Sequence, residues 1–444
     1  MSGRRAVGAR PTGRPLSAAF ADLGGNRSVP VMDSRPTREE GLSRLRSFLE
    51  RAPDYARTRN YDRGPADRDN VSVLSPYLRH RLVTEEEVWE AVLGRHPFGR
   101  VEKFLQEVVW RTYWKGWLEQ RPSVWDDWLS SLEAGRAERP AALAERIGAA
   151  RAGETGIAPF DEWARELAAT NYLHNHARMW FASIWIFTLR LPWEEGAAFF
   201  LEHLLDGDAA SNTLGWRWVG GLQTRGKHYL ARAANIREFT GGRLDPGDAL
   251  REEADPLPWE GLPAPRPPDP PPSPGSDPPR EGDGLFLTTD DLAPETLFAG
   301  EAFEAVAGGR PEESDPRNPA EASPVAAFRR EAVRSTLERQ RDRRGRRGTW
   351  LGPATPESVL DWAREAGIRR LWIPHAPVGP TRRALEGIAA KAGEAGPCLR
   401  RFARDWDRRL HPHAKAGFFR FKKEVLPLLR TPGRPGVTGS AGTF

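Results

Sequence analysis

The residues between positions 171 and 218 bring amide, guanidinium, thioether and carboxylate side chains together with tryptophan. On a helix, Asn175 lies three residues from Arg178 and four from Met179, so the three side chains share one face. A face with these groups is more polar than an ordinary core face. We interpret it as part of a binding site. The alternative that spacing leaves open is a helix end whose polar groups act as caps.

Two carboxylates follow in the sequence Asp206-Gly-Asp208. We expect them at a helix end, where the macrodipole disfavours acids, so each should have a partner. Arg178 is one candidate, because a guanidinium can bind a carboxylate through two parallel hydrogen bonds. An Asp-x-Asp pair could instead hold a divalent cation in a sugar-transferring enzyme, but no nucleotide-binding fingerprint supports that. We therefore expect no metal site.

Predicted helices position these residues. Thr84 and Glu87 predict a capping box at the start of one helix. Apolar residues at helical spacing predict another helix that begins near Glu39. The same spacing predicts helices over 98–119, 171–190 and 193–205.

The helical pattern ends at a proline-rich segment. Of the 40 prolines, 12 lie between Pro256 and Pro279, which predicts an extended, polyproline-like connector. Beyond it, residues 316–348 are polar and rich in arginine. The remaining pattern predicts a small α/β unit with parallel pairing: strands at 285–287, 371–373 and 398–402, and helices at 358–367 and 381–393.

The fold class that we expect is therefore mainly α: an all-helical domain, a Pro-rich linker and a small α/β unit. The predicted boundaries are a disordered basic tail at 1–38, the helical domain at 39–250, the linker at 251–284, the α/β domain at 285–430 and a second disordered tail at 431–444.

The composition limits the class of protein. The 444 residues include 66 Lys and Arg against 61 Asp and Glu, and a single Cys, which excludes a disulfide framework. The basic N-terminus has no apolar signal region, and the richest apolar run, 179–191, is too short to span a bilayer. We expect a soluble cytoplasmic monomer with no membrane partner. Of its 17 tryptophans, 12 lie between Trp89 and Trp218.

The segment 171–218 resembles the C-terminal flavin-binding helical domain of the photolyase/cryptochrome family. Three further blocks agree in order and spacing. Residues 71–78 resemble the phosphate-binding loop of the family, which usually has Thr-Ser-Arg there. Glu107-Val-Val-Trp110-Arg111 resembles its Glu-x-x-Trp-Arg helix. Thr155-Gly156, followed by Asp161 and Arg165, matches the helix before the His-Asn block, so the resemblance covers about residues 70–235.

The resemblance implies an FAD cofactor. Ser72, Leu74 and Ser75 would contact its pyrophosphate, with Arg111 and Asn175 completing the cofactor-binding set. Arg178 and Asp206 would form an ion pair beside the flavin ring, and Asp208 would accept from the imide N–H of the ring.

By the same resemblance, Asn212 would face the reactive N5 of the flavin. Plant-type photoreceptors of the family have Asp at this position and insect-type ones have Cys, so Asn favours repair. The alternative is that Asn212 is a helix-capping amide.

The resemblance also implies a DNA lesion as substrate. Trp110 and Trp218 would line a cavity for the flipped-out lesion, and Glu107 would hydrogen-bond the carbonyl oxygens of a thymine dimer. Asn175 and Met179 would complete this pocket. Relatives that repair the (6-4) photoproduct have His at those two positions. We therefore do not interpret His174 and His176 as that catalytic pair.

For electron transfer, the resemblance assigns Trp216 nearest the flavin and then Trp193. No tryptophan aligns with the third member of the family's chain. Trp163, Trp180 and Trp185 are the available substitutes, and core packing is the alternative for each. For DNA binding we single out Arg225 and Lys227, which follow the Trp218 block, and more weakly the basic run 329–347.

The α/β unit resembles the latter half of the antenna domain that usually precedes the helical domain in this family, with 373–378 as a strand-end loop. It would be shortened or rearranged, so we expect no antenna chromophore.

The leading hypothesis is a deoxyribodipyrimidine photolyase-like carbon–carbon lyase. In this hypothesis, light-excited reduced FAD splits cyclobutane pyrimidine dimers in UV-damaged DNA, with single-stranded DNA as one candidate substrate. A cryptochrome-like flavin photoreceptor without repair activity and a flavin-free DNA-binding helical protein are the alternatives.

Overall fold

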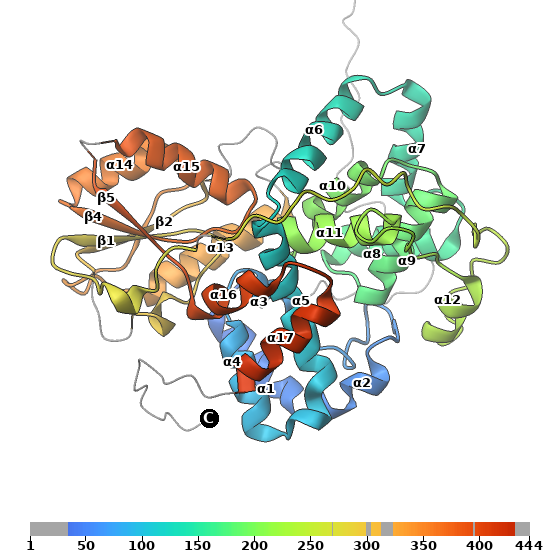
Figure 1. Ribbon diagram of the computed structural model, residues 1–444, viewed down its shortest axis with the longest axis horizontal. Coiled ribbons are helices and arrows are strands. Elements are labelled where there is room, and N and C mark those ends of the chain that lie inside the picture. The colour runs from blue at the N-terminus through green and yellow to red at the C-terminus, as the bar shows by residue number, and fades with distance from the viewer. Residues whose placement is uncertain (1–33, 269, 299–302, 312–322, 394–395, 431–444) are drawn as a thin grey trace, which may run out of the picture.

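The computed structural model describes residues 34–268, 270–298, 303–311, 323–393 and 396–430. Figure 1 shows a helical unit beside a twisted sheet. The predicted fold class is confirmed, since a mainly helical chain is followed by a proline-rich segment and a small parallel α/β unit. The tails predicted at 1–38 and 431–444 lie outside the described residues, apart from residues 34–38.

The helical unit is built around α5 (Phe98–Glu119), which confirms the helix predicted there. Residues such as Val101, Leu105 and Val108 recur every three or four positions and are buried, so this long helix is held by its apolar face. The predicted capping box at Thr84 and Glu87 is present. The other elements of this unit are α1 (Arg38–Leu49), α2 (Tyr55–Thr58), α3 (Ser75–Arg79), α4 (Glu85–Arg95), α6 (Ser123–Ala137), α7 (Ala141–Ala152), α8 (Ala158–Thr170), α9 (Asn175–Ser183), α10 (Trp193–His203), α11 (Ala209–Gly220) and α12 (Ala233–Phe239).

The helix predicted over 171–190 is shorter than expected. It begins at Asn175, because His174 is the N-cap and its Nδ1 accepts a hydrogen bond from the His176 N–H. α9 ends at Ser183, and residues Ile184–Thr188 continue as a π-helical turn. Such turns widen a helix locally and often occur beside functional sites.

The proline-rich segment runs along the helical unit as an extended strap. The N–H of Leu257 donates to the Gly220 carbonyl at 2.9 Å, and the N–H of Arg266 donates to the Gln120 carbonyl at 2.8 Å. These contacts tie the strap to the ends of α11 and α5, so it is packed as well as extended.

The α/β unit has a five-stranded parallel sheet with the order β3-β2-β1-β4-β5. The three predicted strands and their parallel pairing are confirmed, but two more strands and helix α13 were not predicted. The sheet is thus more than the latter half expected of an antenna-like domain. Its elements are β1 (Asp283–Leu287), β2 (Ala305–Gly308), α13 (Pro324–Arg339), β3 (Thr349–Trp350), α14 (Pro356–Glu365), β4 (Arg370–Pro374), α15 (Pro380–Ala392) and β5 (Cys398–Phe402).

The two faces of the sheet belong to different cores. Leu285 and Leu287 join the main core, which extends through the helical unit, whereas Phe286 joins a smaller core with residues of α14 and α15. This alternation follows the period of two along a strand. One face of the sheet therefore connects it to the helical unit.

Two further helices, α16 (Asp405–Leu410) and α17 (Phe418–Arg430), follow the sheet and pack against α5. Figure 1 shows them returning to the helical unit, although the sequence assigned 405–430 to the α/β domain. Gly116 of α5 permits this return, because a Cβ atom there would lie 2.8 Å from the His411 Cα.

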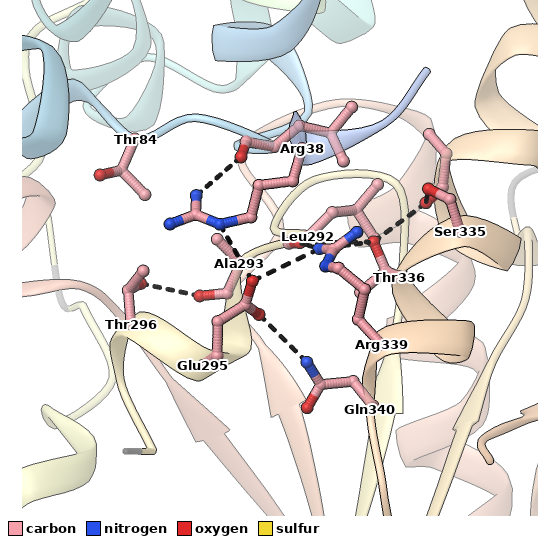
Figure 2. A network of polar contacts seen from close by, with 12 residues as sticks. Arg38, Thr84, Leu292, Ala293, Glu295, Thr296, Ser335, Thr336, Arg339 and Gln340 are labelled. Atoms are coloured by element: carbon pink, nitrogen blue, oxygen red, sulfur yellow. Dashed lines mark hydrogen bonds and ion pairs between the residues drawn. The ribbon is translucent and has the colours of Figure 1, made fainter. Parts of the chain in front are cut away.

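Figure 2 shows a second junction between the units, centred on Glu295. Its carboxylate lies 3.1 Å from Arg38 Nε at the start of α1 and 3.4 Å from Arg339 Nη2 at the end of α13. Gln340 Nε2 also donates to it at 3.1 Å. Two chain segments far apart in sequence are therefore joined through one carboxylate.

Candidate functional site

A cavity of about 720 Å³ opens into the helical unit between α2, α3, α5, α9 and α11. Fourteen of the residues predicted for cofactor, substrate or electron transfer line it together. They are Ser72, Leu74, Ser75, Glu107, Trp110, Arg111, Asn175, Arg178, Met179, Asp206, Asp208, Asn212, Trp216 and Trp218.

One wall of the cavity is the loop that leads into α3. Val73 has φ of 49°, which is rare for a β-branched residue, and Leu74 follows with φ of −86° and ψ of −10°. A left-handed residue followed by a right-handed one turns successive backbone N–H groups toward one point, which makes a nest for an anion. The loop therefore has a backbone suited to phosphate although Val73 replaces the arginine usual in the family.

Next to this loop, Arg178 and Asp206 form the predicted bidentate ion pair. Arg178 donates from Nη1 and Nη2 to the two carboxylate oxygens of Asp206 at 3.0 and 2.9 Å. Burial alone would raise the pKa of Asp206, but Arg178 and a hydrogen bond from Ser75 outweigh it and lower the pKa. Asp206 is thus held ionised beneath the cavity.

The position of Asp208 differs from the one that we expected from the sequence. It lies at the start of α11, as its N-cap, where an acid is favoured, and its Oδ1 accepts from the Ser211 N–H at 2.8 Å. Its Oδ2 lies 3.4 Å from Arg111 Nη2. Burial would raise the pKa of Asp208, but Arg111 and Lys115 lower it.

Asn212 and Trp216 occupy successive turns of α11. Asn212 Nδ2 donates to the Ala197 carbonyl at 2.8 Å, which leaves the amide oxygen as an acceptor at the cavity. Trp216 is buried and packs against Gly196 of α10, where a Cβ atom would lie 2.2 Å from its ring.

The structure brings together only part of the predicted electron-transfer chain. The centroid of the Trp216 ring lies 6.2 Å from that of Trp185, an edge-on contact. Trp193 is buried at the first turn of α10, does not line the cavity and makes no ring contact with Trp216 among the described residues. Trp185 is therefore the tryptophan in direct contact with Trp216.

Toward the mouth of the cavity, Glu107 is ion-paired with Arg59 of the loop after α2. Burial raises the pKa of Glu107, and Arg59 opposes that effect. Sequence reasoning did not identify Arg59, because it lies in a polar stretch without periodicity.

Trp110 and Trp218, the two tryptophans predicted to contact the lesion, differ in exposure. Trp218 is 37% exposed, and its ring stacks on that of Tyr229 with 5.9 Å between centroids. Trp110 is half-buried, and one face is covered by Phe418, 3.5 Å away between centroids with the planes 7° apart. The rings of Trp114 and Tyr113 also contact Trp110, at 5.2 and 5.6 Å between centroids, so only part of Trp110 is left for a ligand, which the sequence did not predict.

The α9 residues point into the cavity as their shared face predicts. Asn175 is exposed and Met179 is half-buried at its wall. His176 also lines the cavity, with its ring stacked on that of Trp180 at 4.0 Å between centroids, and burial lowers its pKa. His174 is buried as the cap of α9.

Arg225 and Lys227 lie outside the cavity, exposed on the turn that follows α11. Neither has an ion-pair partner within the described part of the chain. Both residues follow the C-terminal end of α11, which carries Trp218.

The cavity walls suit a polar cofactor. Asp208 Oδ2, Arg111 Nε, Ser211 Oγ and Trp216 Nε1 are buried at the cavity, and none has a hydrogen-bond partner in the described residues. A flavin dinucleotide carries imide, carbonyl and phosphate groups that could satisfy such atoms. By contrast, no cluster of three metal-ligating side chains occurs in the described ranges, and no helix there is long and apolar enough to cross a bilayer.

Comparison with known proteins identifies the domain. Residues 104–248 match the family model described as the FAD binding domain of DNA photolyase. The chain is 32% identical over 206 residues to the deoxyribodipyrimidine photo-lyase of Streptomyces griseus, and each protein is covered over 43% of its length. A deoxyribodipyrimidine photo-lyase of Thermus thermophilus is 35% identical over 195 residues, covering 42% of this chain and 43% of the relative.

The matched region is thus less than half of either relative. A solved class III photolyase from Agrobacterium tumefaciens overlaps 46% of this chain and 43% of its own, with 27% identity and a TM-score of 0.38, too low to bear on the fold. The residues matched by the family model include α9, α11 and most of α5, which line the cavity. The chain therefore carries a region similar to the FAD-binding domain of DNA photolyase.

Proposed function

We propose that this protein is a light-driven lyase that splits cyclobutane pyrimidine dimers in DNA. One observation carries the proposal: the predicted flavin residues and the predicted lesion residues line the same cavity. Asn212, at the position where photoreceptors of the family have other residues, also favours repair.

The inner part of the cavity would hold the cofactor. The Ser72–Ser75 loop would bind the pyrophosphate through its N–H groups, and Arg178 with Asp206 would fix the flavin ring. Asp208 Oδ2, which is buried beside Arg111 and makes no hydrogen bond with the described residues, would accept from the imide N–H of the ring. When bound there, reduced FAD would supply the light-driven electron chemistry that opens a cyclobutane ring.

The mouth of the cavity would hold the lesion. A dimer that leaves the base stack would lie against Trp218 and the part of Trp110 that lines the cavity. Glu107, whose pKa is raised by burial, would hydrogen-bond the thymine carbonyl oxygens, and Arg59 beside it would stabilise negative charge on them. Exposed Arg225 and Lys227 would contact phosphates without regard to sequence.

The proposal is tested by measuring dimer loss from UV-irradiated oligothymidine, in light and in darkness, with the FAD-loaded protein. Light-dependent loss supports the lyase. A protein that binds photoreducible FAD and leaves the dimers intact would instead be a photoreceptor. A protein without flavin would contradict both. Single-stranded and duplex substrates compared in the same assay would reveal any strand preference.

A further inference from the structure

We propose that Phe419 is a stacking platform for a nucleobase at the mouth of the cavity. This inference rests on the proposed function, because it assumes that nucleic acid approaches this cavity. Phe419 is 77% exposed, and it lines the same cavity as Trp110 and Trp218. Phe419 and Trp218 are two of the four large hydrophobic side chains exposed among the described residues.

Neighbouring residues of α17 have opposite environments. Phe418 is 3% exposed and stacked on Trp110, whereas the next side chain, about a quarter-turn further around the helix, projects into solvent. The rings of Phe418 and Phe419 meet edge to face at 5.9 Å. Phe418 thus packs α17 against α5, whereas the ring of Phe419 remains exposed to solvent.

The backbone that presents Phe419 is firmly held on α5. Tyr113 Oη donates to the Ala416 carbonyl at 2.8 Å, and Phe421, one turn into α17, is completely buried. Lys422 Nζ reaches Glu102 at 2.8 Å. Because the segment is anchored on both sides of Phe419, its backbone is held in place, which lowers the cost of ordering the ring on binding.

The charges around this ring favour nucleic acid over an apolar protein partner. Lys103 of α5 lines the cavity, is exposed and has no ion pair or hydrogen bond with any described residue. Lys423 of α17 is likewise exposed without an ion-pair partner in the described ranges. Exposed lysines beside an aromatic face are the combination that binds a strand by phosphate attraction and base stacking.

The geometry also indicates which base Phe419 would meet. When a lesion moves into the cavity, the base next to it loses a stacking neighbour. An aromatic ring at the rim can replace that neighbour without reading sequence. The proposed occupant is therefore the base that flanks the flipped-out dimer.

The experiment compares Phe419→Ala, Phe419→Trp and wild type in FAD-loaded form. The matched control is Leu262→Ala, which removes an exposed apolar side chain from the strap, outside the cavity lining. The probe is an oligothymidine with one dimer, flanked by a fluorescent adenine analogue whose emission falls when it stacks. Affinity and emission are measured in darkness, and repair of bound DNA is measured in light.

We expect Phe419→Ala to bind dimer DNA about tenfold more weakly and to lose the emission change, while Phe419→Trp retains both. Repair of DNA already bound should stay unchanged, because the ring does not reach the lesion. Phe419→Ala binding within twofold of wild type, with the emission change intact, would overturn the inference. Wild type that binds dimer DNA without repairing it would contradict the proposed function alone, since the binding comparison would still report on Phe419.

Discussion

Arg81 donates two hydrogen bonds from Nη2 to the carboxylate oxygens of Asp407, at 2.6 and 2.7 Å, across a sequence separation of 326 residues. Both side chains are buried. Arg81 also pairs with Glu85 at 3.1 Å and lies 3.6 Å from Asp291, and its backbone is left-handed with φ of 49°. A strained backbone persists where its surroundings fix it. The contact between the helical unit and the C-terminal helices is therefore a specific part of the fold.

Breaking this pair should destabilise the whole protein. In Asp407→Asn, one charge of the pair disappears and Arg81 keeps an incompletely balanced buried charge. We expect the free energy of unfolding to fall by about 3–5 kcal/mol. The measurement is urea unfolding followed by circular dichroism. Asp405→Asn is the control, because Asp405 makes an exposed pair with Arg408 and should cost less than about 1 kcal/mol. Equal losses in the two variants would mean that the junction is not specific.

Flavin retention should depend on the ion pair under the cavity. Arg178→Met leaves the buried carboxylate of Asp206 unpaired and removes the fixed charge beside the ring position. We expect affinity for FAD to fall at least about tenfold, measured by flavin fluorescence during titration of the apoprotein. Arg237→Met is the control, because its pair with Asp245 is exposed and remote from the cavity lining. If both variants keep wild-type affinity, the pair does not hold the cofactor.

Repair should depend on Glu107 more than binding does. Glu107→Gln keeps the size of the side chain and changes its charge and hydrogen bonding to the thymine carbonyls. We expect the repair rate of bound dimers to fall about a hundredfold while affinity for the DNA changes little. Single-turnover repair under constant light measures the rate. Glu102→Gln, on the same helix and paired with Lys422, should repair at the wild-type rate.

Glu166 should make stability depend on pH. Burial, followed by the nearby carboxylate of Asp62, raises the pKa of Glu166 to about 7 against an ordinary value of 4.5, although Arg68 opposes the change. The folded protein keeps this proton where the unfolded chain has lost it. The contribution is therefore complete below about pH 4.5 and is lost as the pH rises to about 7, by up to about 3 kcal/mol.

His174 changes the stability with pH in the opposite direction. Burial lowers its pKa to about 4, so the unfolded chain takes up a proton below the ordinary value of 6.5 and stability falls with decreasing pH. In Glu166→Gln the loss at rising pH should vanish, and stability should rise from about pH 4 to 6.5. Unfolding curves across this range, with wild type alongside, check the difference. If the free energy of unfolding changed with pH in the same way in both proteins, the loss of stability at rising pH would not come from Glu166.

The parts of the site that local spacing encodes were predictable. Asn175, Arg178 and Met179 share a helix face in the structure because three- and four-residue spacing places them there. Arg178 was one candidate partner for the two carboxylates, because a guanidinium can bind a carboxylate through two parallel hydrogen bonds, and the family resemblance assigned it to Asp206.

Long-range contacts were not predictable. Nothing in the spacing of the sequence connects Arg59 with Glu107, or Phe418 with Trp110, since these pairs form only when separate segments pack on α5. β3 has two residues, too few to show alternation, and the arginines of α13 hide an apolar face that includes Phe328 and Val333. The position of Asp208 at a helix start was misjudged, because a residue between two helices can cap either one.

The central claim is that one cavity holds both the flavin and the lesion. Its most direct test is the fluorescence of the protein-bound reduced flavin during titration with DNA. If the lesion lies beside the flavin, dimer-containing oligothymidine should quench the emission as electron transfer competes with it, and undamaged oligothymidine should not. Unchanged emission from protein saturated with dimer-containing DNA would contradict the claim.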